Sequence, residues 1–317
     1  MLVDVVIIVL GFIGLIWGAD KFVFGASAIA RNLGISPLMI GLTIVAFGTS
    51  APEIFSSAVS ALEGKPQLAI GNAIGSNIFN IGVALGVAAL IRPLKPPKSL
   101  FSKEMPALLL VTVVTGLLLC NLYLGGIDAI ILILITIFFG YKLFKKKSKR
   151  AIKEDVAAVN ENQVKSPHAI AYLVLGLVLL ILSAQALVTS ATSVAESLGV
   201  SMAVIGLTVV ALGTSLPELA ASVTCALKGH HEIAIGNIVG SNILNLLAVL
   251  PFPGLISPSP IDSQLLFRDY GAMLLLTLCL CLFCYLAIKR NKSIGRLYGA
   301  VFLLFYCGWF TVMAIQI

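Results

Sequence analysis

The chain has 317 residues, of which 59% are hydrophobic and only 11% are charged, and its mean hydropathy is +1.06. Soluble domains carry about 25% charged residues, so this composition excludes an ordinary soluble domain and indicates an integral membrane protein. The formal net charge of +7 is of a sign that could attract nucleic acid. The basic residues fall between apolar runs, however, so we expect them to set orientation in the membrane and expect no nucleic-acid partner.

Ten apolar runs follow one another along the chain, and each is long enough to cross about 30 Å of hydrocarbon as a helix. In chain order they are residues 2–18, 39–62, 68–90, 105–122, 126–141, 169–187, 202–227, 233–250, 270–288 and 297–317. The first run is predicted to be a retained span, because it lacks the basic start and the cleavage site of a signal peptide. The sequence therefore predicts an all-α membrane protein with ten transmembrane helices.

The basic residues predict how these helices are oriented. If the N-terminus lies outside, 19 of the 21 Lys and Arg residues face the cytoplasm, and only Lys65 and Arg268 lie on the other side. Cytoplasmic loops are the ones that carry an excess of Lys and Arg. We therefore expect both termini to be extracytoplasmic, in a plasma membrane of the bacterial inner-membrane type.

The sequence contains an internal repeat. Residues 40–80 align without a gap with residues 205–245, and 24 of these 41 pairs are identical. Each copy lies among five spans, so the second copy enters the membrane in the opposite orientation, as in many secondary transporters. We predict a first five-helix repeat at 1–141, a basic cytoplasmic linker at 142–166 and a second, inverted five-helix repeat at 167–317.

Each repeat places a glutamate beside a proline inside an apolar run, in "GTSAPE" at 48–53 and "GTSLPE" at 213–218. The proline has no N–H, so it interrupts the helix and frees a carbonyl that needs another partner in lipid. Glu53 and Glu218 have no Lys or Arg within their own spans. A carboxylate at mid-span costs about 2.5–3.5 kcal/mol, so each glutamate is expected to hold either a proton or a cation.

The span after each glutamate adds further oxygen atoms, in "GNAIGSNIFN" at 71–80 and "GNIVGSNILN" at 236–245. Residues four apart share one face of a helix, and hydroxyl and amide oxygens suit hard cations such as sodium and calcium. The residues predicted for the site on this ground are Ser76, Asn80, Ser241 and Asn245. The other asparagines of these blocks are interpreted as contacts between helices. They are Asn72, Asn77, Asn237 and Asn242.

These blocks resemble the two alpha repeats of the sodium/calcium exchanger family, in the calcium/cation antiporter superfamily, and the resemblance covers nearly the whole chain. It is similar to prokaryotic members without a regulatory domain. The resemblance implies four ion sites at the centre of ten helices, with calcium and sodium as transported ions and no cofactor. Calcium would be bound by Glu53 and Glu218 and by the carbonyls of Thr49 and Thr214. Sodium would be bound by the carbonyls of Ala46 and Ala211 and by Ser50, Ser215, Ser76 and Ser241, and Asn80 and Asn245 would complete the centre.

Two features depart from this pattern. Many family members carry aspartate where this chain has Asn245, so its centre holds two carboxylates rather than three. "PFPG" at 251–254 stands where the first repeat has "GVAA", and it is predicted to end the eighth span early.

Several functions stay open at this point. Exchange of calcium for sodium is favoured, and exchange of calcium for protons is the alternative with the same fold. An ion channel fits less well, because it needs a continuous pore, usually built from several subunits, whereas this repeat already closes a two-fold pseudo-symmetric unit. An intramembrane hydrolase fits less well, because it does not need the duplicated serines, threonines and asparagines, and we therefore expect no enzyme. Membrane lipids are the other expected partners, and the sequence carries no information on oligomeric state.

Overall fold

The structure is a computed structural model, and it describes residues 2–145, 166–199 and 211–315. These residues are mostly helical. In the first repeat the elements are α1 (Leu2–Leu33), α2 (Pro37–Ile40), η1 (Gly41–Val45), α3 (Ala46–Thr49), α4 (Ala51–Leu62), α5 (Pro66–Phe79), η2 (Asn80–Leu85), α6 (Gly86–Ile91), η3 (Lys98–Ser102), α7 (Glu104–Leu119), β1 (Tyr123–Leu124) and α8 (Gly126–Lys145). In the second they are α10 (Ser166–Ser197), α12 (Ala211–Thr214), α13 (Leu216–Lys228), α14 (His231–Leu244), η6 (Asn245–Val249), α15 (Pro251–Ile256), β2 (Ser259–Pro260), η7 (Leu265–Tyr270), α16 (Gly271–Lys289) and α17 (Arg296–Ile315).

The helices have the lengths and apolar character of membrane spans. Among the described residues, six helices are long and apolar enough to cross a membrane, and one bent pair, 37–49 with Ala51–Leu62, makes a seventh span. Two shorter apolar helices, Glu104–Leu119 and Gly126–Tyr141, match the predicted fourth and fifth spans. The predicted seventh span, 202–227, lies partly outside the described residues, and its remainder contains α12 and α13. This arrangement confirms the predicted all-α membrane fold.

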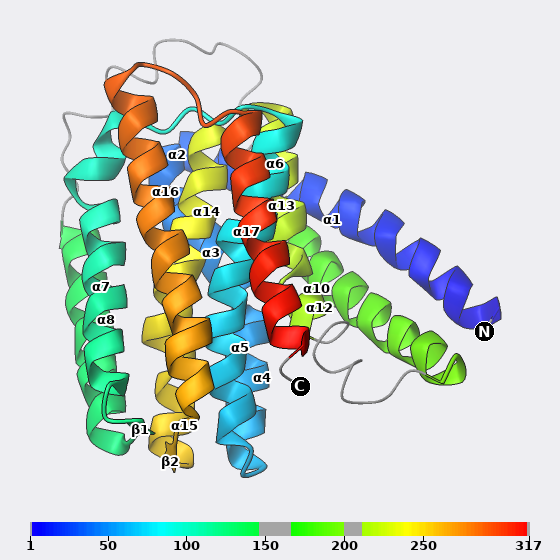
Figure 1. Cartoon of the computed structure of the whole chain (residues 1–317). Helices are drawn as coiled ribbons and strands as arrows, with labels where there is room; N and C mark the ends of the chain where they lie inside the picture. The colour runs from blue at the N-terminus through cyan, green and yellow to red at the C-terminus, as the bar shows by residue number, and fades with distance from the viewer. Residues whose placement is uncertain (1, 146–165, 200–210, 316–317) are drawn as a thin grey trace.

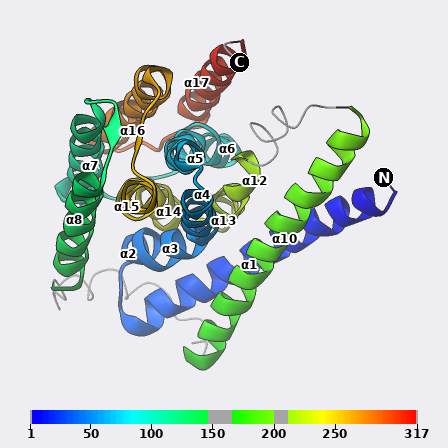
Figure 2. The same cartoon turned by 90° about the horizontal axis from the view of Figure 1, so that it is seen from below.

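The two longest helices, α1 and α10, lie side by side and slant away from the other helices (Figures 1 and 2). Glycines let their backbones touch: a Cβ atom on Gly25 would lie 2.4 Å from the Leu173 nitrogen, and one on Gly176 would lie 2.3 Å from the Phe22 nitrogen. Any larger residue at these two positions would push the helices apart. The pair therefore packs as one tightly joined unit beside the bundle.

Both helices are longer than the predicted spans 2–18 and 169–187, which ended too early. Asp20 and Lys21 did not stop α1, because each has a partner. Asp20 pairs with Lys228 of α13 at 2.6 Å. The Lys21 ammonium lies over the rings of Trp17 and Tyr172, 5.6 and 5.8 Å from their centres.

The remaining helices form a bundle with α5 and α14 near its middle (Figure 2). Both helices are mostly buried, whereas α1, α10 and α17 expose most of their apolar surface, as expected for helices that face lipid. The pair α7–α8 stands on the side opposite α1–α10, and α16 and α17 stand on a third side. A short antiparallel pairing of β1 with β2, Tyr123 opposite Pro260, joins the two repeats at one end of the bundle.

The internal repeat is visible in the element bounds. The shift that aligns 40–80 with 205–245 also converts the bounds of α5 into those of α14, and the bounds of α6 into those of α15. Among the described residues, the four glycines with positive φ follow the same offset: Gly34 is equivalent to Gly199, and Gly64 to Gly229. Equivalent sequences therefore take the same local structure in both halves. The exact limits 1–141, 142–166 and 167–317 stay a prediction, and most of the linker lies outside the described residues.

Proline breaks the two helices that carry the glutamates, as predicted. The helix α3 ends before Ser50, α4 begins with Pro52 in its first turn, and the helix pair that contains them is bent by 43°. In the second repeat α12 ends before Ser215, and α13 begins with Pro217 in its first turn. The breaks place Ser50 and Ser215 at the two helix junctions.

The prediction that "PFPG" ends the eighth span early is wrong. The span continues from His231 to Ile256. Before Pro251, η6 is a wide π-turn in which the Leu250 N–H bonds to the Asn245 carbonyl at 3.1 Å. Pro251 then stands at the first position of α15, where a missing N–H costs nothing, so the helix passes through the proline.

Candidate ion-binding site

The two broken helices bring Glu53 and Glu218 into one buried site. Both side chains are 0% exposed. Ser50 Oγ donates to Glu218 Oε1 at 2.9 Å, and Ser215 Oγ donates to Glu53 Oε1 at 3.0 Å. Each serine at a helix junction thus holds the glutamate of the opposite repeat. Four of the residues predicted for the site therefore meet in space, namely Ser50, Glu53, Ser215 and Glu218.

The neighbouring helices α5 and α14 supply more of the predicted residues. The hydroxyls of Ser76 and Ser215 lie 3.1 Å apart, so Ser76 extends the cluster around Glu53. The Ser241 side chain is fully buried. Asn80 and Asn245 are also fully buried, at the starts of the π-turns η2 and η6.

Several oxygen atoms of these residues have no hydrogen-bond partner in the protein. They are Glu53 Oε2, Glu218 Oε2, Asn80 Oδ1, Asn245 Oδ1 and Ser241 Oγ. Buried polar atoms normally have partners, because leaving one unpaired costs about 1–3 kcal/mol. A group of unpaired carboxylate and amide oxygens is the donor set that sodium-like and calcium-like cations prefer. The residues present therefore suit a hard cation.

The predicted backbone ligands lie in α3 and α12, the short helices that end at the two breaks. The Ala46 carbonyl accepts from the Ser50 N–H at 2.9 Å and from Thr49 Oγ1 at 3.4 Å. Thr214 ends α12, as Thr49 ends α3. Ala211 is the first residue of α12, and its side chain lies outside the described part of the chain.

Two asparagines interpreted from the sequence as packing contacts prove to support the site. Asn237 Nδ2 donates to Ser222 Oγ at 3.1 Å, and Asn237 Oδ1 accepts from Thr49 Oγ1 at 3.1 Å. Asn72 Nδ2 lies 3.0 Å from Ser57 Oγ and 3.3 Å from the Glu53 carbonyl. Ser57 and Ser222 were not among the residues predicted for the site. The signal that could have found them is the internal repeat, because the serine–asparagine pair of the first half recurs at the equivalent positions of the second.

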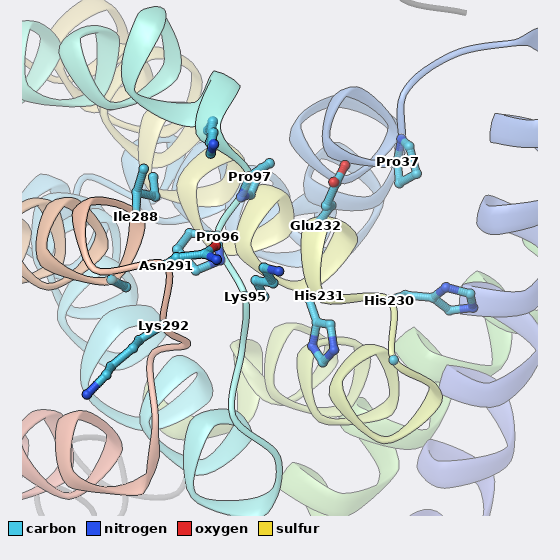
Figure 3. Close-up of a pocket in the computed structure, with 13 residues that line it drawn as sticks. Pro37, Lys95, Pro96, Pro97, His230, His231, Glu232, Ile288, Asn291 and Lys292 are labelled. Carbon is cyan, nitrogen blue, oxygen red and sulfur yellow. The ribbon is translucent and has the colours of Figure 1, made fainter. Parts of the chain in front are cut away.

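A cavity of about 570 Å³ lies elsewhere, among the connections at one end of the bundle (Figure 3). Its lining includes Lys95, Lys98 and Lys292 against a single carboxylate, Glu232. Burial, with further effects of Lys228, Arg31 and His231, lowers the pKa of His230, which also lines the cavity, so this histidine is neutral at neutral pH. The positive lining makes this cavity unsuitable for a cation, and the glutamate pair stays the candidate site.

The fold and the site together define a class of protein. Two inverted repeats, two interrupted helices and an ionisable residue at each break are the features of a secondary transporter with its site where the halves meet. The family described as sodium/calcium exchanger protein matches residues 3–145 and 168–315. The chain belongs to this family of membrane transporters.

Relatives and solved structures agree over the whole chain. The putative antiporter CaxA of Alkalimonas amylolytica is 42% identical over 324 residues, which cover 98% of each chain. The sodium/calcium exchanger MaX1 of Methanosarcina acetivorans is 32% identical over 350 residues, again with 98% of each chain covered. A structure of the sodium-calcium exchanger NCX_Mj soaked with Na⁺ and Sr²⁺ superimposes with a TM-score of 0.84 at 32% identity, and the match covers 100% of this chain and 98% of that one. These matches support a cation antiporter of the calcium type.

Proposed function

We propose that this protein exchanges calcium for sodium across the membrane by alternating access. The observation that carries this proposal is the pair of buried glutamates, each held by a serine of the opposite repeat and each with one oxygen free of protein partners. Two carboxylates balance the charge of one calcium ion. Neutral oxygens around them allow sodium to occupy the same region when calcium leaves.

The proposed ligands are those that the family resemblance implies, and the burial of the glutamates with their unpaired oxygens supports them. Calcium is bound by Glu53 and Glu218 with the carbonyls of Thr49 and Thr214. Sodium is bound by the neighbouring hydroxyls, amides and carbonyls together with the same glutamates. These sodium ligands are Ala46, Ser50, Ser76, Asn80, Ala211, Ser215, Ser241 and Asn245.

Exchange of calcium for protons is the second candidate, because a buried glutamate can also carry a proton. The residues around the glutamates favour sodium. The hydroxyls of Ser76 and Ser215 lie 3.1 Å apart beside Glu53. Hydroxyl oxygens can ligate sodium, but a serine hydroxyl does not take up or release a proton near neutral pH and so cannot carry the proton of an exchange. Asn80 and Asn245 supply amides that do not titrate.

Purified protein in sealed vesicles separates the two candidates. Calcium uptake is measured with an outward sodium gradient at equal pH on both sides, and then with a pH gradient without sodium. We expect uptake only with the sodium gradient. Uptake driven by the pH gradient alone would show that protons, and not sodium, are exchanged for calcium.

The proposed orientation has both termini on the extracytoplasmic side. In Figure 1 the beginning of α1, the end of α17 and the β1–β2 pair all lie toward the lower end of the molecule. Labelling of single cysteines at residues 2 and 315 in intact cells tests the proposal. Labelling only after the membrane is made permeable would mean that both termini face the cytoplasm.

A further inference from the structure

The two repeats touch through a reciprocal pair of asparagines, Asn77 on α5 and Asn242 on α14. Asn77 Nδ2 donates to the Asn242 carbonyl at 3.2 Å, and Asn242 Nδ2 donates to the Asn77 carbonyl at 3.4 Å. Both residues are 1% exposed. The two asparagines occupy equivalent positions in the two repeats. The two hydrogen bonds from their amide nitrogens to the opposite backbone carbonyls are therefore symmetric.

The symmetry ends at the side-chain oxygens. Asn77 Oδ1 accepts from Asn245 Nδ2 at 3.0 Å. The equivalent contact would join Asn80 to Asn242, and it is not made, because Asn242 Oδ1 and both polar atoms of Asn80 have no partner. Asn245 of the candidate site is therefore held by a neighbour, and its counterpart Asn80 has no such contact.

The direction of each amide in this chain of contacts follows from chemistry. The Asn242 carbonyl can only accept, so Asn77 must point its nitrogen toward that carbonyl, and the Met273 sulfur lies 3.4 Å from the same nitrogen. The Asn77 oxygen then faces Asn245 and can only accept, so Asn245 must donate from its own nitrogen. The Asn245 oxygen is left on the opposite side, buried and without a protein partner.

We propose that Asn77 is a positioning residue that makes Asn245 present its oxygen, and never its amide nitrogen, to the transported cation. The proposal rests on the proposed function, because it takes Asn245 as a cation ligand. An amide nitrogen carries hydrogens and a positive partial charge, so a side chain free to turn would spend part of its time repelling the ion. Residues that orient a ligand typically contribute about 10- to 100-fold to metal affinity.

Asn242 provides a matched control, because it equals Asn77 in burial and in its bond to the opposite backbone but has no contact with the candidate site. Because Asn245 is a proposed sodium ligand, we expect Asn77→Ala to raise the KM for sodium by about 10-fold or more, with a much smaller change in maximal rate. We expect Asn242→Ala to leave the KM for sodium within about twofold, because the Asn242 side chain bonds to the Asn77 backbone and not to the Asn77 oxygen that holds Asn245. Equal effects of the two substitutions on KM would overturn the assignment.

A double-mutant cycle tests whether Asn77 acts through Asn245. In an Asn245→Ala background, Asn77→Ala should raise the KM no further, because no amide is left to orient. A full additional increase would mean that Asn77 only stabilises the fold. If Asn77→Ala fails to fold, Asn77→Leu, which fills nearly the same space without an acceptor, takes its place in the same cycle.

Cation binding is measured alongside transport, as the rise in melting temperature of the purified protein with added calcium or sodium. If the wild type binds these ions without exchanging them, the proposed function fails while the Asn77 comparison is still made on binding. If the wild type exchanges calcium and the variants at 77 and 242 behave alike, the proposed function stands and this inference fails.

Discussion

Replacing either glutamate by glutamine should remove calcium transport without harming the fold. Two unit charges 4 Å apart interact by about 4 kcal/mol at an effective dielectric near 20, so one carboxylate attracts a calcium ion by about 8 kcal/mol before desolvation. If only a third of this survives as binding free energy, roughly 2.7 kcal/mol, the affinity still falls about 100-fold. The Glu53→Gln side chain keeps an oxygen that can accept from Ser215, so local structure should persist.

The same substitution should make the empty protein easier to insert and at least as stable, because a carboxylate at mid-span costs about 2.5–3.5 kcal/mol. Sodium-driven uptake of radioactive calcium into vesicles measures transport, and the melting temperature with and without calcium measures folding and binding. Glu63→Gln is the matched control, since Glu63 ends the same helix, is 54% exposed and pairs only with Lys65 in the described contacts. Wild-type calcium flux in Glu53→Gln or Glu218→Gln would refute the proposed site.

Three further outcomes are expected. Cross-linking α1 and α10 to the bundle should stop exchange but preserve calcium binding, and full exchange in a completely cross-linked protein would exclude movement of this pair. Ser215→Ala should raise the KM for sodium by about 10-fold and that for calcium less, because Ser215 links Glu53 to Ser76; equal changes for both ions would argue against separate ligand sets. Asn245→Asp should make exchange more pH-dependent between about pH 6 and about pH 8, because an ionised acid would be a third carboxylate in the proposed site and would face the acceptor oxygen of Asn77, so it takes up a proton first. Identical pH profiles would show that Asn245 does not line the site.

Much of the fold could be predicted, because the physics of a membrane span is local. About 20 apolar residues in a row are sufficient to indicate a span, and a proline inside a span is sufficient to indicate a break. The predicted end of the first span was wrong because a contact with another helix overrode the local rule. The helix α1 continues past Asp20 because Lys228 of another helix pairs with that carboxylate, and no rule applied to residues 2–33 alone could supply this partner.

The candidate site could be predicted to the level of its residues but not of its contacts. A spacing of four places Ser76 and Asn80 on one face of a helix, and the internal repeat places the equivalent residues on one face of a second helix. Neither fact says which helix the face meets. The bonds from Ser50 to Glu218 and from Asn237 to Thr49 join residues 168 and 188 positions apart, so they depend on how the two repeats interlock.

The same limit explains why the asymmetry of Asn77 and Asn242 was not predicted. A repeated sequence supplies equal residues to both halves, so on its own it predicts equal contacts. A transporter whose two oppositely oriented halves had the same conformation would open equally to both sides of the membrane. Ions would then pass through it without coupled exchange. The two halves must therefore differ in conformation at any moment, although their sequences agree. In this structure the difference reaches the site itself, because Asn245 is held by Asn77 while Asn80 is held by nothing in the described protein.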